Sequence, residues 1–544
     1  MPVIMKSPIA IVASQAGLTD PSVKITGYDT TNGIISGINF GSIAGTVYLL
    51  NRDTHTYTSL AVSGWSSDGI VLTNPIDLST IEGTTCFFVR TSKGANSNKY
   101  LVSGNISVSG WGILYVQNPK TGAITKYPMS SSTDMANLVG TSSYNYFYGK
   151  SVTLGSDTVH TSHIVGVQFG TSVSGYTIPA YFLNGLINLD QPIVLTSRMT
   201  LNNSSTYFMY NCRSFNSPLV LQGTNKTRFG NYFMGKCYSF NQPLDLSTVI
   251  YWTQTYFLWN CWGFNNELKL ATNLNSSSRS FGGNFMNNCF SFNQPIKIPS
   301  NANQILNYFM YGATAFNQPI EFPNSIAAVG NYFLAGCYAF NQPIDLSSTT
   351  INLIGTYFMY MAKSFNSTLK FPTTCTSLGT YFLAGITGTT STSYTNMLYG
   401  MSFNQPLETS KITTFGNNFM ANQLSFNQPI SLASCTTIGT NFMLNCSSFA
   451  QPMTVPSTVT SIGASFMLNV IPARVMTVET TTTPPNTALT ITNTTNTSAP
   501  TQLDSTAPAY AEGITLYGSQ RNAWITALPN SSSSPWRNLI NGGS

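Results

Sequence analysis

The segment NYFMGKCYSFNQPLDLS, which begins at Asn231, decides the fold because it returns many times along the chain. Near copies are NFMNNCFSFNQPIKIPS from Asn284, NYFMYGATAFNQPIEFPN from Asn307 and NYFLAGCYAFNQPIDLSS from Asn331. A period of about 20 to 50 residues is typical of solenoid proteins, in which each repeat packs only on its neighbours. The chain is therefore predicted to form a stack of coils.

The phenylalanine of the Phe-Asn-Gln-Pro segment sets the register of the coils, and we call it the mark residue. The marks are Phe215, Phe240, Phe264, Phe292, Phe316, Phe340, Phe365, Phe403, Phe426 and Phe449, with Leu189 in the same place one coil earlier. Neighbouring marks lie 23 to 28 residues apart, except for one step of 38. This predicts about eleven coils over residues 166–470, with one insertion around Gly388–Met397.

Each coil is expected to open with a short helix and to close with a short strand. A Thr or Asn nine residues before the mark can cap a helix, and Phe233, Cys237 and Phe240 recur at helical spacing. The Asn-Gln-Pro that follows ends the helix, and alternating text such as Leu244-Asp245-Leu246 predicts a half-buried strand. Helices about 10 Å wide on strands about 4.8 Å apart favour a curved α/β solenoid, with the parallel sheet concave and the helices convex.

The block Phe-x-x-Cys-x-x-Phe-Asn-Gln-Pro-Leu closely resembles the repeat of BspA-like leucine-rich-repeat surface proteins. The resemblance covers about residues 180–470. Proteins with this repeat include bacterial adhesins, mycoplasma surface proteins and some phage or large-virus proteins. The resemblance implies a leucine-rich-repeat-like solenoid that is displayed on a surface.

The segments around the repeats have different patterns. Residues 20–104 read as short alternating strands between Gly-rich turns, which predicts a small β-sandwich that resembles immunoglobulin-like IPT/TIG domains. Residues 1–19 are expected to be an N-terminal arm, residues 105–165 the N-terminal cap of the solenoid, and residues 471–544 a Thr-rich connector with a C-terminal cap. The predicted fold is therefore multidomain.

The composition argues against several classes of function. Only 40 of 544 residues are charged, and the net charge of +6 includes no Lys/Arg run, so nucleic acid is not expected as a partner. No apolar run reaches the roughly 18 residues of a membrane span, and the first residues do not read as a secretion signal. We find no nucleotide-binding motif, no catalytic triad and only His160 and His163 as a close pair, so no enzyme activity, metal or cofactor is expected.

Two sets of residues are candidates for partner binding. A charged column lies five residues after the mark, at Asp245, Lys269, Lys297, Glu321, Asp345, Lys370 and Glu408. This column can serve cross-strand pairing alone, or it can form a polar binding strip. The insertion carries Tyr394, Met397 and Tyr399 in Thr- and Ser-rich text, a composition typical of binding loops.

Three further columns are predicted to have structural roles. An Asn directly after the mark can satisfy backbone groups of the next coil, at Asn216, Asn241, Asn265, Asn293, Asn317, Asn341, Asn366, Asn404 and Asn427. Six cysteines hold one position three before the mark, where helices about 10 Å apart would keep them unbridged. An aromatic stripe either contacts sugars or protein, or fills gaps between helices, at Tyr238, Trp262, Phe290, Tyr338, Trp259, Tyr311 and Tyr360.

The first functional hypothesis is a non-enzymatic virion surface protein of the capsid-decoration, head-fibre or tail-fibre type. Its N-terminal sandwich would dock to other virion proteins, and its solenoid would meet a glycan or protein of the host surface, in an oligomeric assembly on the particle. The alternative is a bacterial cell-surface adhesin, and a glycan-active enzyme is a remote third hypothesis.

Overall fold

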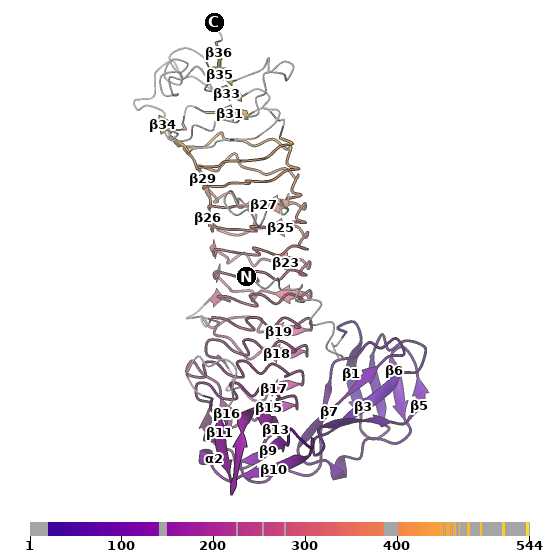
Figure 1. Ribbon diagram of the computed structural model, residues 1–544. Helices are drawn as coiled ribbons and strands as arrows, with labels where there is room; N and C mark the ends of the chain where they lie inside the picture. The colour runs from indigo at the N-terminus through magenta and orange to yellow at the C-terminus, as the bar shows by residue number, and fades with distance from the viewer. Residues whose placement is uncertain are drawn as a thin grey trace. The chain divides into compact units, whose positions relative to one another are not determined.

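The computed structural model describes residues 20–140, 150–224, 227–252, 255–276, 279–385, 401–449, 451, 453–456, 458–459, 461–463 and 467, together with four short strands beyond them. The chain forms two compact units, Met1–Pro299 and Ser300–Ser544, and each is described by itself. The first unit holds a β-sandwich, a cap and the first coils. The second unit holds further coils (Figure 1).

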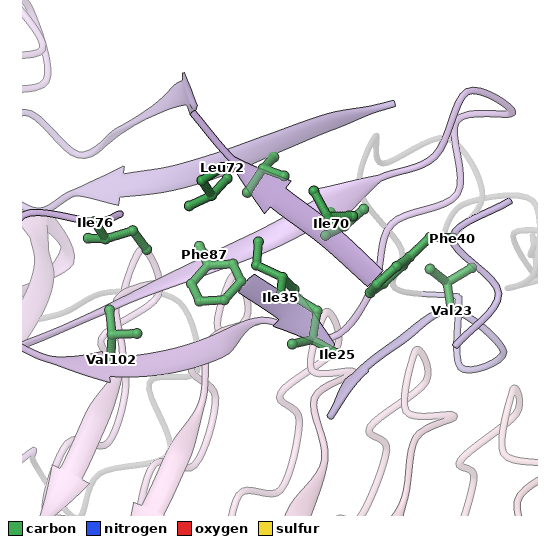
Figure 2. Close-up of a cluster of buried hydrophobic side chains, with 11 residues drawn as sticks. Val23, Ile25, Ile35, Phe40, Ile70, Leu72, Ile76, Phe87 and Val102 are labelled. Carbon is green, nitrogen blue, oxygen red and sulfur yellow. The ribbon is translucent and has the colours of Figure 1, made fainter. Parts of the chain in front are cut away.

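The N-terminal sandwich consists of two four-stranded antiparallel sheets. The first has the order β1 (Lys24–Asp29), β2 (Ile34–Ile38), β6 (Gly69–Leu72) and β5 (Val62–Trp65). The second has the order β4 (Thr56–Leu60), β3 (Thr46–Asn51), β7 (Thr84–Arg90) and β8 (Tyr100–Ser103). Figure 2 shows Ile35 and Phe87 within the buried apolar cluster that these sheets share. The β-sheet prediction for residues 20–104 is thus confirmed.

The segment predicted to be the N-terminal cap, residues 105–165, contributes most of a three-stranded antiparallel sheet. Its order is β10 (Ile124–Met129), β9 (Gly112–Gln117) and β13 (Ile164–Phe169), beside the hairpin of β11 (Ser151–Leu154) and β12 (Asp157–His160). Among the described residues, α2 (Ser132–Ala136) is the single α-helix, and Ser131 with Asp134 forms its capping box. Two short 3₁₀ helices are η1 (Leu78–Thr80) and η2 (Thr161–His163).

The coils of the first unit carry two sets of short parallel strands. The strands that follow the marks are β15 (Ile193–Leu195), β17 (Leu219–Leu221), β18 (Leu244–Leu246), β19 (Leu268–Leu270) and β21 (Ile296–Lys297). The second set comprises β14 (Tyr176–Thr177), β16 (Met199–Thr200) and β20 (Ser280–Phe281). Strands β18 and β19 pair in parallel with Asp245 opposite Lys269, so equivalent residues of successive coils lie side by side.

The second unit repeats this arrangement. The strands that follow its marks are β23 (Ile320–Glu321), β25 (Ile344–Asp345), β27 (Leu369–Lys370) and β31 (Met453–Val455). Its second set is β22 (Gln304–Ile305), β24 (Ala328–Val329), β26 (Leu353–Ile354), β28 (Ser377–Leu378), β29 (Thr414–Phe415), β30 (Thr437–Ile438), β32 (Ser461–Ile462) and β34 (Thr490–Ile491). Beyond residue 470, β33 (Met476–Val478), β35 (Ile514–Leu516) and β36 (Ile540–Gly542) continue the parallel pairing from β31.

The helix predicted at the start of each coil is wrong. In the coil that opens at Asn231, every second residue has a positive φ, namely Tyr232 (61°), Met234 (51°) and Lys236 (61°). The N–H of Cys237 donates to the carbonyl three residues back, Met234 O, at 3.4 Å, whereas an α-helix bonds four residues back. The same text therefore folds as a run of turns, and the described coils in Figure 1 contain no helix.

Hydrogen bonds between coils impose this unusual backbone. The Tyr232 N–H donates to Thr255 O at 3.0 Å, and the Lys236 N–H donates to Trp259 O at 2.7 Å in the next coil. Each positive φ of a non-glycine residue costs about 1–3 kcal/mol and persists only where surrounding contacts enforce it. Because these bonds hold the turns at the spacing of strands, the expected mismatch with wide helices does not arise. The α/β class is thus corrected to a mainly β solenoid, and the reason for a concave sheet disappears.

Candidate functional site

Each coil offers two surfaces that recur in register. We call the strands that follow the marks the strand face. We call the residues from nine before the mark to one before it the turn face. Both lie over a stacked aromatic core, where Phe340 is fully buried and stacks on Phe316 at 5.7 Å and on Phe365 at 6.0 Å between ring centroids. This core makes the coil a firm support for the side chains on either face.

The Asn residues directly after the marks form a ladder of hydrogen bonds. In the first unit, Asn241 Oδ1 accepts from the N–H of Asn265 at 2.8 Å, and Asn265 Oδ1 accepts from that of Asn293 at 2.8 Å. Bonds of the same kind, at 2.7–2.8 Å, join Asn317, Asn341, Asn366, Asn404 and Asn427 in the second unit. The first rung is an aspartate, since Asp190 Oδ1 accepts from the N–H of Asn216 at 2.8 Å.

A second ladder was missed from the sequence. The Thr or Asn nine residues before the mark was predicted to cap a helix. Instead, Asn307 Oδ1 accepts from the N–H of Asn331 at 2.8 Å, and Asn331 Oδ1 accepts from that of Thr356 at 2.8 Å. Because the preference for Asn or Thr is the same for a cap and for such a ladder, the residue type alone did not separate the two roles.

The cysteine column lies inside the stack with free thiols. All nine cysteines are buried and unbridged. The thiols donate to carbonyls of the preceding coil, for example Cys237 Sγ to Met209 O at 3.1 Å and Cys337 Sγ to Met310 O at 3.1 Å. The predicted reason, a helical spacing, is wrong. Parallel side chains at strand spacing place neighbouring Cβ atoms about 4.8 Å apart, beyond the roughly 3.5–4.5 Å that a disulfide requires.

The charged column lies exposed on the strand face, and four of its seven members form ion pairs across neighbouring strands. Lys269 Nζ donates to Asp245 Oδ2 at 2.9 Å, and Lys370 Nζ donates to Asp345 Oδ2 at 3.1 Å. Hydrogen bonds from Ser347, followed by the Lys370 ammonium, lower the pKa of Asp345 to about 2. Exposed ion pairs of this kind each contribute between about 0 and 1 kcal/mol to the free energy of unfolding. The column therefore mainly keeps the strands in register and the surface hydrated.

The remaining predicted site residues are placed as follows. Lys297 is exposed on β21 in the first unit, and Glu321 is exposed on β23 in the second. Glu408 is exposed, and hydrogen bonds from the Ser410 hydroxyl and then from the Ser410 N–H, at 3.1 Å, lower the pKa of its carboxyl. Tyr394, Met397 and Tyr399 lie outside the described residues.

Within the first unit, the N-terminal sandwich contacts the strand face of the first coils. Lys99 Nζ lies 3.1 Å from Ser217 Oγ and 3.4 Å from Asp190 Oδ1, and the Lys99 N–H donates to Gln242 Oε1 at 2.7 Å. Lys24 forms an ion pair with Glu267 further along the same face. The sandwich therefore neutralises the aspartate that begins the Asn ladder.

A buried arginine joins the sandwich to the cap and the first coil. Arg52 is 6% exposed, and its guanidinium donates to Gln191 Oε1 at 2.9 Å and to Val167 O at 3.2 Å. It also lies 5.1 Å from the centre of the Tyr115 ring. Burial lowers the pKa of Arg52 to about 10, because the loss of water around the guanidinium outweighs its attraction to Tyr115, Cys86 and Asp53. Three parts of this unit thus share one polar anchor.

The turn face is lined with aromatic rings. In the first unit, Tyr181, Tyr207, Tyr232 and Tyr256 stack nearly parallel with centroids 4.3–4.7 Å apart. In the second unit, Tyr308, Tyr332, Tyr357 and Tyr381 stack in the same way at 4.3–4.5 Å. These rings are half-buried and cover each other's faces, so mainly their edges and hydroxyls reach the solvent.

A second set of rings lies across this tyrosine ladder. Trp259, five before its mark, meets Tyr232 at 6.0 Å and 73° and Tyr256 at 5.8 Å and 76°. Lys236 Nζ lies over Tyr210 at 5.5 Å and over Trp259 at 5.2 Å. The coil between Tyr210 and Trp259 has Gly235 at the equivalent position. A Cβ added to Gly235 would lie 2.9 Å from Tyr210 Cδ2. These members of the predicted aromatic stripe therefore pack across neighbouring turns, whereas the sequence had suggested either packing between helices or contact with sugars or protein.

The sequence of the turn face contains no Asp or Glu in any coil, from the coil marked by Leu189 to the coil marked by Phe449. The charged residues between nine and one before the marks are Arg213, Lys236 and Lys363. All the acidic residues of the coils from Asp190 to Glu408 lie at or after the marks, on the strand side. The two faces thus differ in charge as well as in backbone.

The described residues contain no metal centre and no membrane-spanning helix. No three of their His, Cys, Asp or Glu side chains cluster as metal ligands would. No helix among them is long and apolar enough to cross a bilayer. His160 and His163 lie with ring centroids 5.8 Å apart at the edge of η2.

Together these observations define a repeat solenoid of mainly β structure, preceded by β sheets. No family model matches this chain, and no curated protein matches it. The chain is similar to a solved leucine-rich repeat protein from Bacteroides ovatus, with 12% identity and a TM-score of 0.36 over 69% of this chain and 90% of that one. It is also similar to a leucine-rich cell surface protein from Faecalibacterium prausnitzii, with 13% identity and a TM-score of 0.30 over 70% and 96% of the two chains. TM-scores this low do not bear on the function of this chain.

Proposed function

We propose that this protein is a non-enzymatic surface protein of the bacterial adhesin type, in which the solenoid presents an extended contact surface to its partner. The observation that carries the proposal is the recurrence of the same side chains, coil after coil, on two faces. An enzyme needs carboxylates that converge in a pocket. Here the carboxylates of the strand face pair in register with lysines, as Asp245 and Asp345 do.

The surface chemistry supports display outside the cytoplasm. The chain has 7% charged residues, so we expect uncharged polar residues such as Ser, Thr and Asn to make most of its polar surface. The resemblance to BspA-like repeats points to adhesins in the same direction. No observation on the described residues favours the virion role that was expected from the sequence. That role is therefore kept as an outcome of the test.

The N-terminal sandwich is proposed to be immunoglobulin-like. Its two sheets have the orders β1-β2-β6-β5 and β4-β3-β7-β8. Lettered along the chain as A, B, C, C′, D, E, F and G, these orders read A-B-E-D and C′-C-F-G, which supports an immunoglobulin-type arrangement. Since Arg52 and Lys99 tie it to the first coils, this domain acts as a fixed base of the solenoid.

Protease shaving of intact producer cells tests the proposal. The expected result is that peptides of the coils are released while the cells remain intact, and that the purified protein adheres to a surface without cleaving it. Recovery of the chain only from lysed cells would contradict the proposal. Recovery in purified virus particles from the same culture would replace it with the virion role.

A further inference from the structure

The turn face of the second unit contains rings whose faces are not covered by stacking. The tyrosine ladder from Tyr308 to Tyr381 is closed, because each ring stacks on the next. Tyr311 instead meets Tyr308 and Tyr332 nearly at right angles, at 79° and 80°, with both centroids 5.8 Å away. Tyr360 meets Tyr357 and Tyr381 in the same way, at 86° and 75°. Each of these rings therefore lies along the stack and spans two coils.

The spacing of these two rings follows from their size. A ring that spans two coils leaves no room for a second large ring in the coil that follows. The equivalent residues of the following coils are Ala335, after Tyr311, and Ala384, after Tyr360. Tyr311 and Tyr360 thus lie two coils apart, which corresponds to about 10 Å at a strand spacing of about 4.8 Å, and the coils after Ala384 carry Ala421 and Leu444 at this place.

The surroundings of the two rings are polar and free of carboxylates. Tyr338, in the coil between them, is 44% exposed, and its carbonyl accepts from the Ser364 N–H at 3.1 Å. Lys363 occupies the position equivalent to Tyr338 in the next coil and is also exposed. It is the only charged residue of the turn-face text in the second unit. The surface therefore combines aromatic rings, phenolic hydroxyls and one cation.

We propose that this surface binds an extended, β-linked acidic polysaccharide. In such a chain successive sugars are turned over, so every second sugar presents the same face, and two such sugars match the two rings that lie two coils apart. The apolar faces of sugars pack on the rings of Tyr311 and Tyr360, the hydroxyl of Tyr338 bonds to sugar oxygens, and Lys363 pairs with an acid group. The inference rests on the proposed surface role and names the ligand class of that surface.

Charge complementarity decides for an acidic ligand over a neutral one. A neutral polysaccharide would have no acid group to pair with Lys363. The spacing of repeating side chains in an acidic protein segment would not match two rings that lie two coils apart. Because the rings are held edge-to-face by the ladder, they lose little freedom when a ligand binds.

The test uses the full-length protein and isothermal titration with three probes. These are a β-1,4-linked mannuronic acid hexamer, the matching dimer, and neutral cellohexaose. The hexamer should bind most tightly and lose affinity in high salt, because it reaches both rings and carries charge. Tyr360→Ala should weaken binding of the hexamer about tenfold, whereas Tyr360→Phe keeps the ring and should retain most of it.

A matched pair of lysines provides the control. Lys363 and Lys370 belong to the same coil and are both exposed, but Lys370 lies on the strand face. Lys363→Ala should weaken the acidic hexamer and leave cellohexaose unchanged, whereas Lys370→Ala should change neither. If Tyr360→Ala unfolds the protein, this pair still decides the question, since neither lysine is buried.

The proposal is overturned if the hexamer does not bind, if Lys370→Ala weakens it as much as Lys363→Ala does, or if the dimer binds as tightly as the hexamer. Its failure is distinct from failure of the surface role. Release of coil peptides from intact cells would still support display even if no polysaccharide bound.

Discussion

The N-terminal sandwich and the coils reach β structure by opposite routes. In the sandwich, strands of four to seven residues pair antiparallel, and the burial of β2 alternates strictly between exposed and buried residues. In the coils the strands are two or three residues long, and most of the rest is a run of turns. The sandwich thus follows local preferences of its residues. The coil backbone is imposed by its neighbours.

This difference predicts how damage spreads. A sandwich strand draws its stability from one or two partner strands and from a core that the two sheets share. A coil has no core of its own, because each buried ring stacks on rings of the coils before and after it. The coils should therefore lose structure together, whereas the sandwich should fail by itself.

The largest effect is expected from the removal of a buried ring in each region. Phe340→Ala in the coils and Phe87→Ala in the sandwich should each cost about 3–5 kcal/mol, because both side chains are fully buried. For the Phe340→Ala variant, hydrogen exchange should show loss of protection in the neighbouring coils. For the Phe87→Ala variant, the loss of protection should be confined to the sandwich. Protection that stays normal in the coils beside the Phe340 variant would contradict the shared core.

The next effect concerns the positive φ of the turn face. Met361 has φ 59°, and Gly336 occupies the same place one coil earlier with φ 73°. Met361→Val should destabilise the protein by about 1–3 kcal/mol, since β-branched residues are outliers in this region, whereas Met361→Gly removes that strain. As the counterpart in the sandwich, Ser59→Val on the exposed edge of β4 should be neutral. Equal effects of the two valines in urea unfolding would argue against an imposed backbone.

The Asn ladder should give a smaller effect. Asn341 Oδ1 accepts from the N–H of Asn366 at 2.7 Å and from Ser367 Oγ at 3.1 Å. Asn341→Ala leaves these donors to water and should cost about 1 kcal/mol, because the site is exposed. Asn341→Asp keeps the acceptor, as Asp190 does in the first rung, and should cost less in thermal unfolding. An aspartate as costly as alanine would show that the amide acts in another way.

The smallest effect is expected from the surface ion pairs. Lys370→Gln should change stability by less than about 0.5 kcal/mol, since the pair is exposed. Because the pKa of Asp345 is lowered to about 2, its contribution is present above the ordinary carboxyl pKa of about 3.9 and is lost as the pH falls toward 2. In an NMR titration, Ser347→Ala should raise this pKa more than Lys370→Gln does. The reverse order would make the ion pair the main cause.

The strands of the coils were predictable because Leu244-Asp245-Leu246 alternates between apolar and polar residues, as a half-buried strand does. The helices were predicted wrongly because Phe233, Cys237 and Phe240 are spaced four and three residues apart, a spacing that a run of turns reproduces. The available signal was the position four before the mark. It carries Asn211, Asn260, Gly312 and Gly336, residue types that tolerate positive φ.

The aromatic surface was only partly readable from the sequence. Tyr311 and Tyr360 were recognised as a stripe, yet the alternation with Ala335 and Ala384 has no meaning until the coil spacing is known. At helical spacing those rings would fill gaps. At strand spacing Tyr311 and Tyr360 each span two coils, which explains the alanines that follow them and leaves a surface on which a ligand can lie. The anchors formed by Arg52 and Lys99 depend on long-range contacts that no local pattern reports.

Far-ultraviolet circular dichroism of the full-length protein tests the central claim most directly, namely that the turn face is a run of turns held by neighbouring coils. The account predicts a spectrum of β structure and turns, with almost no helical signal, because α2 is the single α-helix of the described residues and spans five of them. A pronounced helical double minimum, as expected if every coil opened with two or three helical turns, would contradict it.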